Sequence, residues 1–211
     1  MIDERTGEKH IADVRTQDNL VIEFQHSHIV PEERTSREQF YQNMVWVVDG
    51  TRLKRDYPRF LKGRMNTFHN TIFYETDNPR VFKVDLLDWC FPVDWLKSSV
   101  PVVFDFRGDG LLEDDEGLRN VLYCLFPQYG RYARVVEFSP KAFVAATTMG
   151  KWSSKVKEFI SQFKEQDEIE EKEREQLNSQ SSRRSSHSFG GMNYFQRRIY
   201  LTTKPRRRRR F

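Results

Sequence analysis

The chain has 211 residues, of which 37% are hydrophobic and 31% are charged, and its formal net charge is +4. This size suits one domain with extensions, and the composition supplies enough apolar side chains for a core. No apolar run approaches the roughly 18 residues of a membrane span, and Met1–His10 lacks the apolar stretch of a secretory signal. We therefore expect no membrane span and a cytoplasmic protein, in which Cys90 and Cys124 are buried small hydrophobic residues rather than a disulfide framework.

The net charge hides an asymmetry between the body of the chain and its end. Ser179–Phe211 contains ten Arg or Lys residues and no Asp or Glu, which leaves 25 basic and 31 acidic residues in Met1–Asn178. Any argument for nucleic-acid binding from overall charge therefore rests on the tail alone.

The first predicted element is a hairpin with strands at Lys9–Asp13 and Val21–Ser27, joined by a turn at Thr16–Asn19. Side chains alternate between the faces of a strand, so Glu23 and Gln25 point one way, and Ile22, Phe24 and His26 point the other. An antiparallel partner strand would bring Asp13, near the end of the first strand, beside Glu23. Two carboxylates that converge in this way suit Mg²⁺.

The next elements follow from helix and strand signals. A helix is predicted at Val30–Asn43, because Pro31 suits its first turn and Glu32 and Glu33 suit its positive N-terminal end. Met44–Val48 reads as a buried strand closed by an Asp-Gly turn. Thr51–Met65 is basic and partly helical. Later strands are predicted at Phe68–Tyr74, Val81–Leu87 and Val100–Phe106, and Leu118–Phe126, Tyr132–Phe138 and Ala142–Thr148 extend the fold.

The C-terminal part is predicted to contain a helix, a linker and a tail. Apolar residues recur at helical spacing from Trp152 to Phe163. A charged extension follows in Lys164–Gln176, then a Ser/Arg-rich linker in Asn178–Gly191. We therefore divide the chain into a domain at 1–163, an extension and linker at 164–191, and a basic aromatic tail at 192–211.

Several of these motifs together resemble the competence protein CoiA-like nuclease family of the PD-(D/E)XK superfamily. The run ADV, VIEFQHSHI, EER, FY and VWVVDG has the order and spacing of that family over roughly Lys9–Thr51, and VPVVFDFRG is similar more weakly. The matching residues are Asp13, Glu23, Gln25, Ser27, Arg37, Tyr41 and Trp46. The resemblance implies an α/β fold with a restriction-endonuclease-like core, in which helices flank a central mixed sheet, followed here by a C-terminal helix and a disordered basic tail.

The resemblance also implies a mechanism. Asp13, Glu23 and the backbone carbonyl of Phe24 would hold Mg²⁺ or Mn²⁺, which would polarise a scissile phosphate and activate a bound water. Gln25 takes the place of the usual lysine, so it can orient a water or a phosphate oxygen but cannot neutralise charge. Such a protein would hydrolyse DNA in uptake, recombination or processing. The alternative is a catalytically silent nucleic-acid-binding module, and a third interpretation is a partner-binding protein that docks through its Trp152–Phe163 helix.

One part of the family pattern is not found. Nucleases of this core usually begin with a helix that supplies a further acid, whereas only Met1–Glu8 precede the first strand here. Glu4 or Glu8 are the available substitutes. Otherwise the chain is a fragment, or its site is incomplete and its activity is reduced.

Other polar residues have both a functional and a structural interpretation. Ser27 could bind phosphate or be an ordinary strand hydroxyl. Arg37 and Tyr41 could contact phosphate or brace the site, or they could be a surface arginine and a tyrosine that packs the helix on the sheet. His10 is the histidine closest to Asp13 and could line the site, although it matches no zinc spacing with His26 and His28. The acidic residues Asp105, Asp109, Asp114 and Asp115 favour a solvated loop over a metal site.

The tail offers a possible contact with nucleic acid. Arg206, Arg207, Arg208, Arg209 and Arg210 would attract a phosphate backbone without reading its sequence. Nearby aromatic residues could stack on bases. A solvated end is the alternative for the same residues, and the oligomeric state is not predicted.

Overall fold

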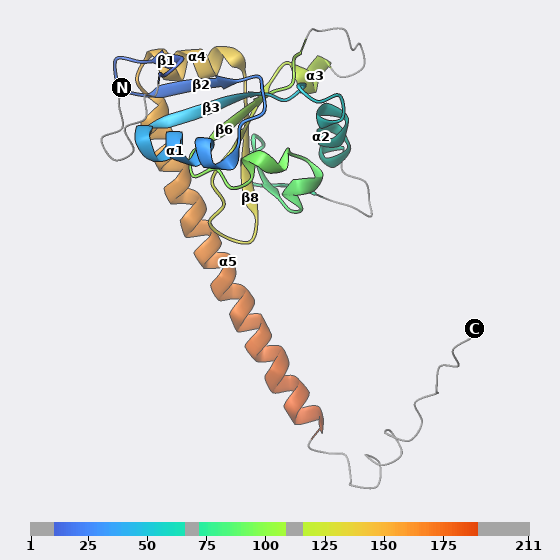
Figure 1. Cartoon of the computed structure of the whole chain (residues 1–211). Coiled ribbons are helices and arrows are strands. Elements are labelled where there is room, and N and C mark those ends of the chain that lie inside the picture. Colours follow the sequence, from blue (N-terminus) through green and yellow to red (C-terminus); the bar gives the residue numbers. More distant parts are fainter. Residues whose placement is uncertain (1–10, 66–71, 109–115, 190–211) are drawn as a thin grey trace, which may run out of the picture. The chain divides into compact units, whose positions relative to one another are not determined.

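A computed structural model describes residues 11–65, 72–108 and 116–189 (Figure 1). Its centre is an eight-stranded mixed sheet in the order β1-β2-β3-β6-β7-β8-β5-β4. The strands are β1 (Val14–Arg15), β2 (Val21–Gln25), β3 (Met44–Asp49), β4 (Phe73–Glu75), β5 (Val81–Val84), β6 (Val102–Asp105), β7 (Leu122–Leu125) and β8 (Ala133–Phe138). The predicted α/β fold with a mixed sheet is confirmed, because β2, β3 and β6 are parallel and the other neighbours are antiparallel.

Helices cover both faces of this sheet. They are α1 (Pro31–Tyr41), α2 (Asp56–Arg64), α3 (Glu116–Arg119), α4 (Pro140–Thr148) and α5 (Trp152–Phe189), and two short 3-10 turns are η1 (Leu87–Trp89) and η2 (Val93–Trp95). Tyr41 of α1 and Phe60 of α2 pack on one face, whereas Phe143 of α4 and Trp152 of α5 pack on the other. Strand residues alternate between these two clusters, as the period of a strand requires.

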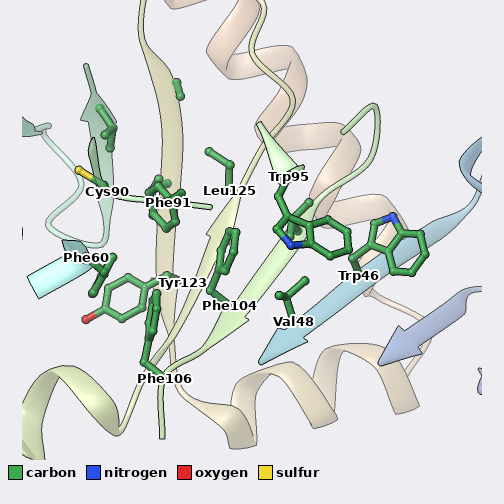
Figure 2. Packing of buried hydrophobic residues seen from close by; sticks show 14 of the residues in the cluster. Trp46, Val48, Phe60, Cys90, Phe91, Trp95, Phe104, Phe106, Tyr123 and Leu125 are labelled. Atoms are coloured by element: carbon green, nitrogen blue, oxygen red, sulfur yellow. The ribbon is translucent and has the colours of Figure 1, made fainter. Parts of the chain in front are cut away.

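The larger cluster is rich in aromatic rings (Figure 2). Phe60 stacks on Phe106 with ring centroids 4.2 Å apart and lies 4.6 Å from Tyr123. Phe106 also packs on the turn after β3, where a Cβ on Gly50 would lie 2.4 Å from its ring. The Asp-Gly turn predicted from the sequence is therefore also a close-packing position. Burial of these side chains is the main force that holds the sheet and its helices together.

Other boundaries differ from the sequence prediction. The described part of the predicted first strand, Ile11–Asp13, is not a strand. Instead β1 consists of Val14 and Arg15, after which the chain turns through a bond from the Thr16 amide to the Leu20 carbonyl. The predicted turn is confirmed, with Asn19 in the left-handed conformation at φ 59°. Leu118–Phe126 divides into α3 and β7. Ala142–Thr148 lies in α4, whose N-terminus is capped by Ser139.

The last helix is longer than predicted. α5 continues to Phe189, through most of the segment interpreted as a linker. Lys, Glu, Gln and Arg are good helix formers and no proline interrupts this stretch, so a helix can continue without a packed face. The chain divides into two compact units, Met1–Asp167 and Glu168–Phe211. The basic tail at 192–211 lies outside the described residues.

Candidate active site on strand β2

Two acids predicted for the site are brought together by the β1–β2 hairpin. Val14 pairs with Ile22, and the register continued by one residue places Asp13 opposite Glu23. The Asp13 carboxylate accepts a hydrogen bond of 2.8 Å from the Phe24 amide, at Oδ2. Asp13 is exposed at this edge of the sheet, whereas Glu23 is only 3% exposed. The predicted pairing is therefore formed although Asp13 precedes β1 instead of lying within it.

Glu23 is held in an environment that disfavours its charge. Burial raises the pKa of its carboxyl, Arg37 opposes this effect, and the nearby charge of Asp13 adds to it. Its Oε2 accepts a bond of 2.9 Å from Nη1 of Arg37. Its Oε1 is buried and has no hydrogen-bond partner among the described residues. A buried acceptor without a partner costs about 1–3 kcal/mol, so this oxygen favours the approach of a cation or a donor.

Helix α1 supplies the groups that face the two acids. Arg37 bridges Glu23 and Glu33, with Nη2 2.8 Å from Oε1 of Glu33. One helical turn later lies Tyr41, which is partly buried. Burial raises the pKa of Tyr41, and the charge of Glu23 raises it further. Its phenol therefore stays protonated near neutral pH. Because Arg37 pairs with two carboxylates, its contacts agree with the interpretation that it braces the site.

Gln25 and Ser27 meet at the end of β2. Nε2 of Gln25 donates to the backbone carbonyl of Ser27 at 2.9 Å and to its Oγ at 3.0 Å. Gln25 shares a face with Glu23, as the alternation predicted, whereas the Phe24 ring lies on the opposite face and is 43% exposed. Ser27 therefore orients the side-chain amide of Gln25.

The remaining candidates either lie outside the described residues or pair elsewhere in the fold. His10 and the loop residues Asp109, Asp114 and Asp115 lie outside the described residues, as do Glu4 and Glu8. His26 lies 3.9 Å from Asp49, and His28 lies 3.5 Å from Asp94. No cluster of three or more His, Cys, Asp or Glu suited to a metal ion is present in residues 11–65, 72–108 and 116–189.

Asp105 is occupied by a neighbour. Arg107 donates to both of its carboxylate oxygens and also through its backbone amide. Burial alone would raise the pKa of Asp105, but these bonds outweigh it and lower the pKa. Asp105 is the last residue of strand β6 and is partly buried, so the predicted solvated acidic loop does not include it.

The cysteines lie in the core, as the sequence predicted. Cys90 and Cys124 are both buried and free, and burial raises the pKa of Cys90 to about 12. Both thiols are therefore protonated and unreactive under ordinary conditions.

Sequence reasoning missed a cleft at the carboxyl ends of β2, β3 and β6. It is about 1160 Å³ in volume and contains residues from several segments that are distant in sequence, among them Phe24, Lys54 and Arg119. The carboxyl ends of parallel strands are where α/β proteins usually bind ligands, so a predicted sheet order would have pointed to this edge.

The mixed sheet, its helices and the paired acids on β1–β2 define an α/β nuclease-like domain. Residues 9–89 match the family described as the competence protein CoiA, nuclease-like domain. The match contains Asp13, Glu23, Gln25, Arg37 and Tyr41. No curated protein and no solved structure matches the chain. Among the described residues, no helix is long and apolar enough to cross a membrane.

Proposed function

We propose that this chain is a metal-dependent nuclease that hydrolyses phosphodiester bonds in DNA. The observation that carries the proposal is the buried, unbonded Oε1 of Glu23 beside the second carboxylate of Asp13. Residues 9–89, which carry both acids, match a nuclease-like family. By that match, the process served would be DNA uptake, recombination or processing, and free buried thiols fit the reducing cytoplasm.

The donor set fits a hard divalent cation. Carboxylate and backbone carbonyl oxygens are the ligands that Mg²⁺ and Mn²⁺ prefer, and Asp13, Glu23 and the Phe24 carbonyl would supply them. When bound, the metal would polarise the scissile phosphate and lower the pKa of a water molecule. Its charge would also compensate the burial of Glu23, which lacks a partner at Oε1.

The neighbouring residues would then orient the reactants. Arg37 holds Oε2 of Glu23 in place through a bond of 2.9 Å, so the other oxygen stays directed away from it. Gln25, held by Ser27, would orient the attacking water or a phosphate oxygen without adding charge. The Tyr41 hydroxyl remains protonated and can donate a hydrogen bond to the same phosphate.

One observation favours the second candidate, a silent nucleic-acid-binding module. Arg37 already pairs with Glu23, and an internal cation can take the place of a metal. In that case the buried ion pair would stabilise the fold without hydrolysis. The arginines at 206–210 would give either protein an electrostatic contact with DNA.

The experiment is a nicking assay on supercoiled plasmid DNA with Mg²⁺, with Mn²⁺ and with a chelator. We expect cleavage only with metal, and we expect Glu23→Gln to reduce it at least about 100-fold, because the charge that holds the metal is lost. Glu32→Gln is the matched control, since Glu32 is an exposed acid on α1 that does not face Asp13. DNA binding without cleavage under every metal condition would instead identify the silent module.

A further inference from the structure

The cleft at the carboxyl ends of β2, β3 and β6 is a second candidate site, and Glu23 is not among the residues that line it. Its walls come from the strand ends and from α2, α3 and α4. Its volume of about 1160 Å³ is slightly above the usual range for ligand pockets, which is about 300–1,000 Å³. The cleft is therefore large enough for a nucleotide and part of its neighbours.

Several exposed apolar side chains line this cleft. Phe24 is 43% exposed and Val144 is 56% exposed, and both line the cleft together with the exposed Leu53. Phe24 is an aromatic ring at a sheet end, and such rings are the platforms on which proteins stack nucleic-acid bases. The apolar part of the cleft therefore fits a flat, unpaired base.

Two cations of the cleft have no acidic partner among the described residues. Arg119 is 7% exposed, its guanidinium lies 4.1 Å above the Tyr57 ring, and its Nη1 donates to the Arg107 carbonyl at 3.3 Å. Its Nε is buried without a hydrogen-bond partner in the described part of the chain. Lys54 also lines the cleft and is exposed. A buried guanidinium without a carboxylate is costly, and an anionic ligand would compensate it.

The acids that line the cleft do not cancel these charges. Asp105 is held by Arg107, and Oδ1 of Asp49 accepts bonds from the amide and hydroxyl of Thr51. Each acid is thus satisfied by a near neighbour in sequence. Arg119 and Lys54 remain available for a phosphate.

We propose that this cleft binds an unpaired nucleotide of the nucleic-acid strand, with its phosphate at Arg119 and Lys54 and its base against Phe24 and Val144. The inference rests on the proposed function, since it names the form in which the substrate is held. Glu23 and Phe24 are neighbours on opposite faces of β2, and the Phe24 amide binds Asp13. A nucleotide in the cleft would therefore anchor the strand close to the two carboxylates.

The test compares two labelled octamers, oligo-dT and an octamer of abasic nucleotides with the same phosphates, by fluorescence anisotropy on the full chain without metal. We expect the whole chain to bind oligo-dT at least about fivefold more tightly than the abasic octamer, because one stacked base contributes that much or more to the affinity. Phe24→Ala should remove this preference. Trp89→Ala, which changes another exposed aromatic residue that does not line the cleft, should retain it.

The phosphate contact is tested by a second variant and its matched control. Lys54→Ala should weaken the binding of both octamers and lower the slope of log affinity against log salt by about 0.7, the value for one contact to a single strand. Arg55→Ala removes an exposed cation next to it in sequence but outside the cleft, and its slope should not change. Equal affinity of the chain for the two octamers, or an undiminished base preference in Phe24→Ala, would overturn the proposal.

Failure of this inference can be told apart from failure of the proposed function. If the chain never cleaves DNA but Phe24→Ala removes its base preference, the cleft proposal stands and the nuclease proposal fails. If the chain cleaves plasmid DNA but binds the two octamers equally, the nuclease proposal stands and the cleft proposal fails.

Discussion

Glu23 is the residue in which burial and charge oppose each other most directly. In the sequence it lies between the apolar residues Ile22 and Phe24, where a buried carboxylate needs a partner or a metal. The structure supplies one partner, Arg37, on only one of its two oxygens. The residue is therefore suited to a further cation, and its protonation is linked to the stability of the fold.

This linkage predicts a pH dependence. Burial raises the pKa of Glu23, so the folded chain binds its proton more tightly than the unfolded chain does. The stability that this proton contributes is complete below the unfolded value of about 4.3 and is lost as pH rises through the higher folded pKa. Because glutamine does not titrate, the Glu23→Gln variant does not lose this stability as the pH rises. The free energy of unfolding of the variant relative to the original chain should therefore increase from mildly acidic to neutral pH.

Urea unfolding at several pH values in that range measures this difference. Glu32→Gln serves as the comparison, because it removes an acid of the same type from the exposed surface of α1. If both variants give the same change with pH, burial of Glu23 does not control its protonation.

At the scale of elements, helix α1 determines how the site is assembled. It carries Arg37 and Tyr41 toward β2, and a buried carboxylate fixes its position on the sheet. Glu38 accepts bonds from the Trp46 indole at 3.1 Å, from the Ser98 hydroxyl at 2.8 Å and from the Ser99 amide at 2.9 Å. Because Arg34 and Glu38 are an (i, i+4) pair, a sequence reading could have noticed them, but not the two serines 60 residues away.

We expect Glu38→Ala to lower the free energy of unfolding by about 3–5 kcal/mol, since it leaves the buried Arg34 and several buried donors without their carboxylate. Urea denaturation monitored by tryptophan fluorescence measures the loss, because Trp46 packs 5.3 Å from Trp95 beside this network. The exposed Glu32→Ala should change stability by no more than about 0.5 kcal/mol. A loss in Glu38→Ala as small as that of the control would contradict the bracing role of Glu38.

At the scale of the whole molecule, the chain divides inside its last helix. The unit Met1–Asp167 uses the first turns of α5 as part of its core: Phe163 is 4% exposed and packs 5.3 Å from Phe126. Arg134 also pairs with Asp167 at the end of this unit. The unit Glu168–Phe211 contains the remainder of α5 and the basic tail.

A chain that ends at Asp167 should therefore unfold at the same urea concentration as the full chain. One that ends at Lys151 should be strongly destabilised or unfolded, since burial of Trp152 and Phe163 is lost and each such residue contributes about 3–5 kcal/mol. The Asp167 truncation also removes the arginines at 206–210, so its DNA binding should be weaker and less dependent on salt. Equal stability of both truncations would show that α5 is not part of the core.

The sequence by itself determined the turn at Thr16–Asn19, helix α1 and the candidate acids, because these depend on local preference and on the alternation of strand side chains. The α/β class was predicted through the resemblance to a nuclease family. The sequence also determined the resemblance from which the metal and the DNA substrate are proposed. The tertiary structure alone decided that one oxygen of Glu23 is bonded and the other is not. It also decided that Glu38 meets Ser98 and Ser99, and that Phe24, Lys54 and Arg119 line one cleft. These are contacts between segments that lie far apart along the chain, and only the order of strands in the sheet brings them together.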